Sequence, residues 1–174
     1  MKHKSALETE LKLRIPATGP YRSLLEALGF HEVHPAQSEV SVLWDRDDQL
    51  RATGSALRTR SYAGQSRLTW KGAKIPDALL KIRPEQESGI ENPEALEAIL
   101  RALGFQPVMG MEKLRAVWER TELEACLDET PFGCYLELEG EPQAIRVAME
   151  GLGLAPDRAE TRSYPELYQA HGLG

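Results

Sequence analysis

The stretch that decides the fold is LETELKLRI, residues 7–15, in which apolar and polar residues alternate. Successive side chains of a β-strand point to opposite faces of the sheet. One face of this strand would carry Leu7, Leu11, Leu13 and Ile15, and the other would carry Glu8, Glu10, Lys12 and Arg14. The stretch therefore predicts a strand with one apolar and one ionisable face.

The same alternation returns along the rest of the chain. It predicts eight strands, near residues 5–15, 32–44, 55–62, 66–73, 79–88, 107–119, 121–129 and 133–140, of which the second is the least regular. Helices are predicted from Pro20 to Gly29, from Asn92 to Gly104 and from Pro142 to Leu152, with a short helix after Ser163. Residues 45–54 are predicted to form a long loop. Together these elements predict a single α+β domain over residues 1–174.

The ionisable faces of seven of these strands carry charges of both signs. The cations are Lys12, Arg14, Arg58, Arg60, Arg67, Lys71, Lys81, Arg83, Lys113 and Arg115, and the anions are Glu8, Glu10, Glu85, Glu87, Glu124, Asp128, Glu137 and Glu139. An open sheet that turns its charges to water is the commonest outcome of such a pattern. We favour an eight-stranded antiparallel β-barrel with the charges inside and helices over its apolar outer wall. A solvated face does not need this density of paired cations and paired carboxylates, whereas a barrel of about eight strands encloses one small ligand.

The composition is that of an ordinary globular protein and limits the choice of partners. Apolar residues make up 41% and charged residues 28% of the chain. The net charge of -6 argues against general nucleic-acid binding, which favours a basic surface. No apolar run approaches the roughly 18 residues of a membrane span, and the charged N-terminal segment has no signal-peptide core. We therefore expect a cytoplasmic protein that binds neither nucleic acid nor membrane, with Cys126 and Cys134 reduced.

The charged face indicates chemistry on a polyanion. Arginine presents a rigid fork to phosphate oxygens, and lysine presents a point charge. Carboxylates would repel such a ligand unless they held Mg²⁺ or Mn²⁺, since these ions take oxygen ligands from carboxylates and phosphates alike. Glu8 and Glu10 lie two residues apart on one face, as do Glu137 and Glu139. The pattern predicts a cavity that binds linked phosphates together with a divalent metal.

Several short motifs carry a resemblance to a known family. Residues 8–12 read E-x-E-x-K, residues 57–60 L-R-x-R, residues 68–72 L-T-x-K-G, residues 83–87 R-x-E-x-E and residues 113–115 K-x-R. Asp128, the G-x-x-x-E-x-E of residues 133–139 and the S-Y-x-x-L of residues 163–167 complete the series. In this order the motifs resemble those of the CYTH family, the triphosphate tunnel metalloenzymes, over nearly the whole chain.

That resemblance implies an eight-stranded tunnel, a divalent metal and roles for single residues. It implies metal binding by Glu8, Glu10 and Glu139, with Glu137 and Asp128 as further candidates. It implies substrate binding by Arg58, Arg60, Lys71, Arg83, Lys113 and Arg115. Lys12 would touch phosphate or help to activate water, which makes it the catalytic candidate. Some members pair a lysine with a tyrosine just before the aspartate that Asp45 matches, but Leu43 and Trp44 occupy that stretch here, which puts such a pair in doubt.

The resemblance leaves the reaction open. We favour a triphosphatase, in which water attacks the terminal phosphate of tripolyphosphate or of a nucleoside or other organic triphosphate. The alternative is a class IV adenylate cyclase, which converts ATP to cyclic AMP and pyrophosphate. A module that binds without catalysis would lack the metal carboxylates, which are present here. The physiological substrate, the choice between Mg²⁺ and Mn²⁺ and the formation of a homodimer stay open. Tyr164 is expected to pack on the domain rather than to close one mouth of the tunnel.

Overall fold

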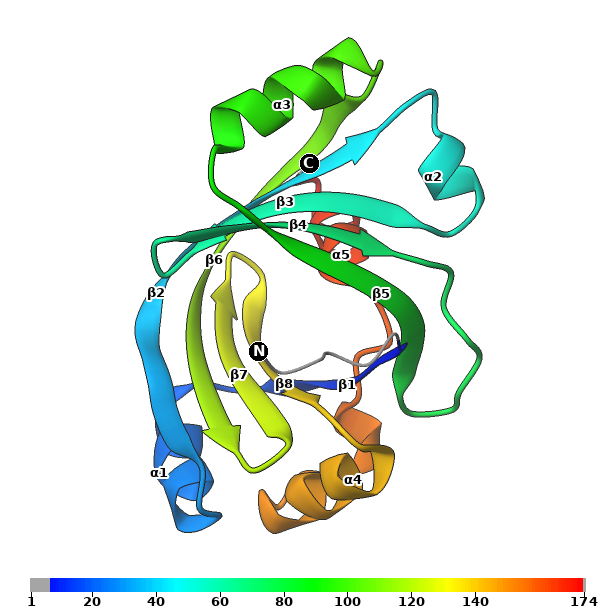
Figure 1. The fold of residues 1–174 in the computed structure, drawn as a ribbon. Coiled ribbons are helices and arrows are strands. Elements are labelled where there is room, and N and C mark those ends of the chain that lie inside the picture. Colours follow the sequence, from blue (N-terminus) through cyan, green and yellow to red (C-terminus); the bar gives the residue numbers. More distant parts are fainter. Residues whose placement is uncertain (1–6, 174) are drawn as a thin grey trace.

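The computed structural model describes residues 7–173, and Figure 1 shows the path of the chain. Its strands are β1 (Leu7–Ile15), β2 (His31–Asp45), β3 (Ala56–Tyr62), β4 (Gln65–Lys71), β5 (Lys81–Ile90), β6 (Gln106–Arg120), β7 (Leu123–Thr130) and β8 (Gly133–Glu139). Its helices are α1 (Gly19–Ala27), α2 (Gln49–Ala52), α3 (Pro93–Ala102), α4 (Pro142–Gly151) and α5 (Tyr164–Ala170), with a 3₁₀ turn at Pro156–Arg158. Residues 5 and 6 of the first predicted strand lie outside the described residues.

All eight strands form one closed antiparallel barrel. Their order around it is β1-β5-β4-β3-β2-β6-β7-β8, and β1 completes the circle by pairing with both β5 and β8. Glu10 of β1 is the register partner of Lys81 on β5 and of Glu139 on β8, so charged positions lie side by side around the wall. The predicted eight-stranded antiparallel barrel is confirmed. None of the helices in the described part of the chain has the length and apolar content needed to span a membrane.

β2 and β6 are the longest strands, with 15 residues each. Their pairing contains register shifts around His34 and between Leu43 and Trp44. Such bulges bend a strand and interrupt the alternation of its side chains. This interruption is the physical reason why the second strand looks irregular in the sequence.

The loop predicted over residues 45–54 contains the short helix α2 instead. Asp45 organises it from the end of β2. Its Oδ1 accepts hydrogen bonds from the amides of Arg46 and Leu50 at 2.7 and 3.0 Å, and its Oδ2 accepts one from Arg51 at 3.0 Å. Burial raises the pKa of Asp45, but these three amides outweigh burial and hold the pKa below its usual value. The prediction of a loop without a helix was wrong. The carboxylate of Asp45 accepts hydrogen bonds from amides at the start of α2, and these bonds support a helix of only four residues.

The main hydrophobic core lies outside the barrel, between the wall of β1, β6, β7 and β8 and the helices α1 and α4 (Figure 1). On the strand side, Leu11, Leu13, Leu136 and Leu138 are each at most 1% exposed. On the helix side, Leu25, Ile145 and Ala148 are buried to the same degree. The apolar face of residues 7–15 therefore points out toward helices, which leaves its ionisable face to the interior.

The other half of the outer wall is covered more thinly. Leu100 of α3 is buried, while Ile99 of the same helix and Leu103, the residue that caps its C-terminus, are 55% and 58% exposed. Val40 of β2 and Leu114 of β6 are also 46% and 45% exposed. The helical cover expected around the barrel is therefore dense only on the side of α1 and α4.

Candidate functional site

The barrel encloses a cavity of about 890 Å³ that is lined by residues of all eight strands and of α2 and α5. Of the residues that the sequence assigned to metal or substrate, eleven line it: Glu8, Glu10, Lys12, Arg58, Arg60, Lys71, Arg83, Lys113, Arg115, Glu137 and Glu139. The alternation of apolar and polar residues also predicted that five further charged residues point inside. All five line the cavity: Arg67, Lys81, Glu85, Glu87 and Glu124. Closure of the sheet thus brings together charges that lie far apart in the sequence.

Two charges expected inside the barrel lie elsewhere. Arg14 is exposed at the end of β1, where its guanidinium donates to the carbonyl oxygen of Phe132 at 3.3 Å. Its placement in the lumen was wrong because the strand leaves the cavity before Arg14 is reached. Asp128 is fully buried, but in the described part of the chain it does not belong to the cavity wall.

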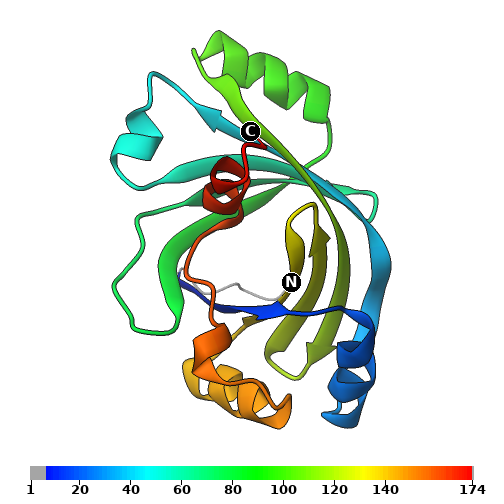
Figure 2. The ribbon, with the colours of Figure 1, turned by 180° about the vertical axis from the view of Figure 1, so that it is seen from behind.

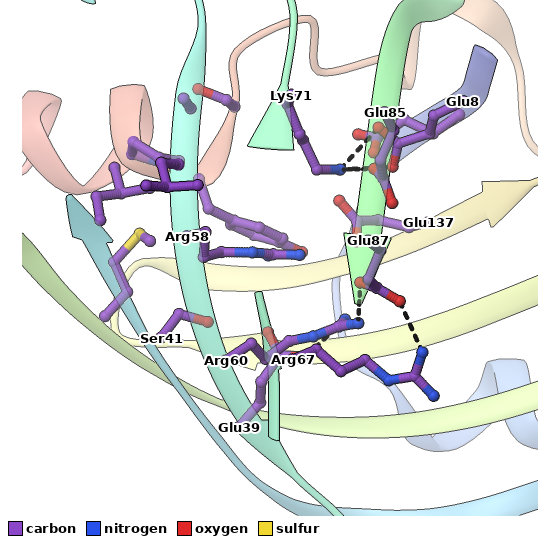
Figure 3. Close-up of a pocket in the computed structure, with 18 of the residues that line it drawn as sticks. Glu8, Glu39, Ser41, Arg58, Arg60, Arg67, Lys71, Glu85, Glu87 and Glu137 are labelled. Atoms are coloured by element: carbon purple, nitrogen blue, oxygen red, sulfur yellow. Dashed lines mark hydrogen bonds and ion pairs between the residues drawn. The ribbon is translucent and has the colours of Figure 1, made fainter. Parts of the chain in front are cut away.

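Two glutamates share one lysine near β5 (Figure 3). The Nζ of Lys71 lies 2.6 and 2.7 Å from the two carboxylate oxygens of Glu8 and 2.8 Å from Glu85. Burial raises the pKa of Glu8 to about 8, because Lys71 offsets only part of the effect of burial and of the neighbouring carboxylates. Oxygen ligands from two strands, β1 and β5, therefore meet at one lysine ammonium group.

Glu10 begins a row of carboxylates that crosses three strands. Glu139 of β8 is the register partner of Glu10 on one side and of Glu124 on β7 on the other. Burial acts to raise the pKa of Glu10, but the ammonium of Lys81, with which Glu10 forms an ion pair, outweighs burial and lowers the pKa to about 2. Glu10 is therefore ionised at neutral pH. Glu8, two residues away on the same strand, has the higher pKa and holds its proton more tightly.

Lys12 is the most enclosed cation of β1, with 2% of its surface exposed. Its Nζ lies 3.3 Å from Oε1 of Glu137 and 3.5 Å from the ring centroid of Tyr164. Burial lowers the pKa of Lys12 to about 7, although Glu137 offsets part of that effect. An amine in this state can exchange a proton near neutral pH, as a general base requires.

Asp128 holds two of the cavity cations in place. Its Oδ1 accepts a hydrogen bond from Nε of Arg115 at 2.7 Å. Its Oδ2 accepts bonds from Arg115 at 2.6 Å, from Lys113 at 3.0 Å and from the hydroxyl of Tyr164 at 2.5 Å. Because a carboxylate offers about four lone-pair sites, these four donors leave little room for a metal ion. The geometry makes Asp128 a positioning residue for Lys113 and Arg115, and metal binding by Asp128 stays a prediction.

Glu39 is a central residue of the site that the sequence analysis missed. It lies on β2, is 2% exposed, and its carboxylate is 3.5 Å from Arg60, 3.5 Å from Lys113 and 3.6 Å from Arg115. Burial would raise its pKa, but the surrounding cations outweigh burial and hold it well below its usual range. The regular alternation of Glu39 and Ser41 with Val40 and Val42 carried the signal, but the register shifts on either side of this stretch make the strand as a whole look irregular.

Arg58 extends from β3 toward the middle of the cavity (Figure 3). Its Nε is buried without a hydrogen-bond partner, and no ion pair of its guanidinium is found among residues 7–173. By contrast, the neighbouring Arg60 is bound to Glu87 at 3.1 Å. Arg58 is therefore a cation of the cavity wall whose buried Nε could donate a hydrogen bond to a ligand.

The helix α5 closes one end of the cavity. Figure 2 shows it beside the opening of the barrel, and a capping box between Ser163 and Glu166 starts the helix. Its first residue, Tyr164, points inward, with the Nζ atoms of Lys12 and Lys113 at 3.5 and 3.9 Å from its ring centroid. Tyr164 therefore lines the cavity, since two ammonium groups attract the face of its ring and its hydroxyl donates a hydrogen bond to Asp128. That it packs rather than closes a mouth of the tunnel stays a prediction.

Comparison with known proteins places this geometry in a family. The family model of the CYTH domain matches residues 6–149. The chain belongs to the CYTH family. A Methanocaldococcus jannaschii protein provisionally named an adenylate cyclase is 31% identical over 172 residues, which cover 92% of this chain and 98% of the relative. Members of the CYTH family are enzymes, triphosphatases or adenylate cyclases, so the family explains why cations and carboxylates share one tunnel.

Solved structures share the CYTH fold of this chain. A Vibrio parahaemolyticus protein provisionally named an adenylate cyclase matches with a TM-score of 0.83 and 18% identity over 95% of this chain and 99% of its own. A Hippeastrum protein provisionally named an adenylyl cyclase, and described as having a dominant triphosphatase activity, matches with a TM-score of 0.68 and 23% identity. That match covers 94% of this chain and 96% of the Hippeastrum chain. At these identities the likeness shows a shared fold.

The CYTH family implies a divalent metal, and the donor atoms of the cavity suit one. Within residues 7–173 no three acidic, histidine or cysteine side chains converge on one point, since Lys71 and Lys81 occupy Glu8 and Glu10. The available donors are carboxylate oxygens, which are the ligands that Mg²⁺ and Mn²⁺ prefer. Burial raises the pKa of Glu8, and positive charge close to the carboxyl group opposes that effect, as Lys71 already does in part. A divalent ion would take the place of a lysine ammonium group beside these carboxylates.

Proposed function

We propose that this protein is a divalent-metal-dependent triphosphatase that hydrolyses the terminal phosphate of a triphosphate held inside the barrel. The observation that carries the proposal is the state of Arg58 in the cavity wall, where its buried Nε has no hydrogen-bond partner and its guanidinium forms no ion pair within residues 7–173. A buried donor left without a partner costs about 1–3 kcal/mol, more for a charged group, so the site is incomplete without an anion. A chain of phosphates supplies several oxygens to Arg58 and to the cations around it.

Cations from four strands would share the binding of the phosphate chain. Arg58 and Arg60 would bind phosphate oxygens from β3, and Lys113 and Arg115 would bind them from β6. Asp128 holds the guanidinium of Arg115 and the ammonium group of Lys113 in place, so that little side-chain freedom is lost on binding. Lys71 and Arg83 would complete the clamp from β4 and β5.

Glu8, Glu10 and Glu139 would hold Mg²⁺ or Mn²⁺, with Glu137 as a further ligand. When bound, the metal supplies positive charge that neutralises the phosphate oxygens as the reaction proceeds. The carboxylates of β1 and β8 lie next to each other in register, which lets them approach the phosphate chain from one side. The cations of β3 and β6 would hold the chain from elsewhere on the wall.

In the reaction, water attacks the terminal phosphorus and the bond from that phosphorus to the bridging oxygen breaks. The water proton passes to the amine of Lys12, which is the proposed catalytic residue. Arg58 and Arg60 stabilise the negative charge that spreads over the equatorial oxygens. Orthophosphate and the shortened phosphate chain then leave the barrel.

A second candidate reaction is the conversion of ATP to cyclic AMP and pyrophosphate, which the name of the M. jannaschii relative favours. The same clamp would bind ATP, with the ribose 3′-hydroxyl in place of water and the α-phosphate as the point of attack. The Hippeastrum protein bears a cyclase name and a triphosphatase activity together, so a cyclase name alone does not decide between the reactions.

Product analysis tests the proposal. The protein is incubated with tripolyphosphate or ATP in Mg²⁺ or Mn²⁺, and orthophosphate, pyrophosphate and cyclic AMP are measured separately. We expect orthophosphate. Cyclic AMP with an equal amount of pyrophosphate would replace the triphosphatase with the cyclase, and tight binding without any product would indicate a binding module.

A pair of matched variants ties the activity to the cavity. Glu10→Gln removes a proposed metal ligand, and we expect turnover to fall by at least a hundredfold. Glu150→Gln makes the same change on the exposed surface of α4 and should leave turnover unchanged. Full activity of Glu10→Gln would show that the metal site lies elsewhere.

A further inference from the structure

The row of cations in the cavity wall stops on the side that faces away from α2. Because α2 lies between the end of β2 and the start of β3, β3 runs away from it, and so does β6, which is antiparallel to β2. Along β3 the inward residues are Arg58, Arg60 and then Tyr62, and along β6 the cations Lys113 and Arg115 precede the rest. We call the part of the cavity beyond these cations the far end, and its wall contains Tyr62, Arg67, Val117, Glu119, Glu124 and Cys126.

The far end is poorly suited to phosphate. Within residues 7–173, Arg67 is the one arginine or lysine that lines it, and Arg67 is already bound to Glu87 at 2.8 Å and to Gln65 at 3.0 Å (Figure 3). Glu119 and Glu124 are register partners on β6 and β7, so two carboxylates lie side by side there. A phosphate that entered the far end would therefore leave its cations and approach negative charge.

On the side of α2 and α5 the wall keeps its positive charge. The hydroxyl of Tyr168 on α5 contacts the backbone of Glu112, which precedes Lys113 on the α2 side of β6. Arg51 of α2 and Lys74 of the loop before β5 line the cavity as well. A long phosphate chain would find partners in this direction and would lack them in the other.

Glu39 lies at the level where the cations stop. It lines the cavity from β2, opposite its register partner Lys113, and its carboxylate is 3.5 Å from Arg60 and 3.6 Å from Arg115. An N–H···O hydrogen bond spans roughly 2.7–3.2 Å, so these are ion pairs without hydrogen bonds. Its Oε2 has no hydrogen-bond partner among the described residues, although the side chain is 2% exposed.

Other carboxylates hold the same cations in place. Arg60 is bound to Glu87 at 3.1 Å, and Arg115 donates two hydrogen bonds to Asp128 at 2.6 and 2.7 Å. Glu39 therefore adds negative charge to the site while others fix its geometry. A carboxylate that is buried without hydrogen bonds is costly, so its presence in a cation-lined cavity requires an explanation. Repulsion of a bound anion provides one.

We propose that Glu39 is a specificity-determining residue that stops the phosphate chain at the level of Arg60 and Arg115, so that the terminal phosphorus, and no inner one, lies at the point of attack. The inference rests on the proposed function, because it assumes that the cations of the cavity bind the chain. Negative charges a few ångströms apart repel each other strongly in an enclosed cavity, so the terminal phosphate does not pass Glu39. The rest of the chain extends toward α2 and α5.

Loss of this charge changes the expected products from ATP. In the wild type, water attacks the γ-phosphorus, the bond to the oxygen that bridges the β- and γ-phosphates breaks, and ADP and orthophosphate leave. In Glu39→Gln the chain can move one phosphate further. Water then attacks the β-phosphorus, the bond to the oxygen that bridges the α- and β-phosphates breaks, and AMP and pyrophosphate leave. Each reaction consumes one water, whose proton passes to Lys12.

The test identifies the initial products from ATP in the wild type and in three variants. We expect the ratio of AMP to ADP to rise about tenfold in Glu39→Gln, an ordinary factor for one changed contact in a specificity site. Glu39→Asp keeps the charge and should keep a ratio close to that of the wild type. Leu25→Ala truncates a fully buried side chain of α1, outside the set that lines the cavity, and should lower stability without changing the ratio. An equal change of the ratio in Glu39→Gln and Leu25→Ala would overturn the inference.

Tetrapolyphosphate gives a test that needs no variant. A chain stopped at its end loses one phosphate at a time, so the wild type should release orthophosphate and tripolyphosphate as its initial products. Initial release of two pyrophosphates from each tetrapolyphosphate would overturn the inference, whether or not Glu39→Gln folds.

Binding separates failure of this inference from failure of the proposed function. If the protein cleaves none of these compounds, the proposed function fails, and titration calorimetry with tripolyphosphate decides the inference. Glu39→Gln should bind about tenfold more tightly than the wild type, because a negative charge beside the chain is lost. Glu112→Gln removes an exposed carboxylate outside the set that lines the cavity and should bind like the wild type. Equal or weaker binding by Glu39→Gln would overturn the inference.

Discussion

Replacement of Asp128 by asparagine distinguishes a positioning carboxylate from a metal ligand. Asn keeps the shape of the side chain but removes the charge on which Arg115, Lys113 and Tyr164 converge at 2.5 to 3.0 Å. Breaking a buried ion pair by neutralising one partner costs about 3–5 kcal/mol, because the other charges stay buried without compensation. Since 1 kcal/mol lowers Tm by about 2–4 °C in a domain of this size, a loss of about 4 kcal/mol predicts a fall of roughly 8–16 °C.

The assay is thermal unfolding in EDTA, where no metal contributes to stability. Glu124→Gln is the matched control, because Glu124 lies on the same strand and lines the cavity, without an ion pair among the described residues. Its Tm should change by less than about 4 °C, as expected for a change within about 1 kcal/mol. An Asp128→Asn protein that melts like the wild type in EDTA but binds Mg²⁺ more weakly would refute the positioning role and support metal binding by Asp128.

Three further perturbations test other parts of the site. Glu39→Gln should destabilise the ligand-free protein by about 3–5 kcal/mol and increase the stabilisation by added tripolyphosphate, both measured as Tm shifts, because three cations lose their shared carboxylate; equal Tm values for the two proteins without ligand would contradict this. Tyr164→Phe keeps the ring between two lysines and loses the bond to Asp128, so Tyr164→Ala should raise KM more than Tyr164→Phe does; identical KM values would argue that the ring does not order the lysines. Burial acts to raise the pKa of Glu166, but Ser163 and Lys74 outweigh it and lower the pKa to about 2, so its stabilising effect is complete above its ordinary pKa of 4.5 and is lost as the pH falls from there toward 2. Because Glu166 is half exposed, the effect should be below about 1 kcal/mol, and urea unfolding of Glu166→Gln at pH 6 and pH 3 should show a weaker acid destabilisation than the wild type.

The sequence predicted the barrel because its strands alternate strictly where they are straight. Residues 7–15 place Glu8, Glu10 and Lys12 on one face of β1. Because the opposite, apolar face packs against the helices outside the closed barrel, these three side chains point into the cavity. Parity could not predict where a strand leaves the cavity, so Arg14 was placed inside although it is exposed. The point at which a strand leaves the cavity is set by how the whole sheet closes, and the local alternation of residues carries no information about it.

The least predictable parts of the site depend on bulges and on long-range contacts. Glu39 and Ser41 lie on a regular stretch of β2, but the register shifts on either side of that stretch make the strand as a whole look irregular in the sequence. The inward position of Tyr164, on α5, depends on Lys12, Lys113 and Asp128, which come from three different strands. That Arg58 forms no ion pair within residues 7–173 is likewise seen only in the folded chain, where the nearby Glu39 and Glu87 bind other cations.

Binding of tripolyphosphate to Arg58→Gln and Arg14→Gln, measured by titration calorimetry beside the wild type, tests most directly whether the interior charges form the substrate site. Both variants remove one arginine that strand parity had placed inside, but only Arg58 lines the cavity among the residues that the structure describes. We expect Arg58→Gln to weaken binding by about tenfold or more, as for loss of a hydrogen bond to a charged group, and Arg14→Gln to bind like the wild type. Equal binding by all three proteins, or a larger loss in Arg14→Gln, would contradict a phosphate site inside the barrel.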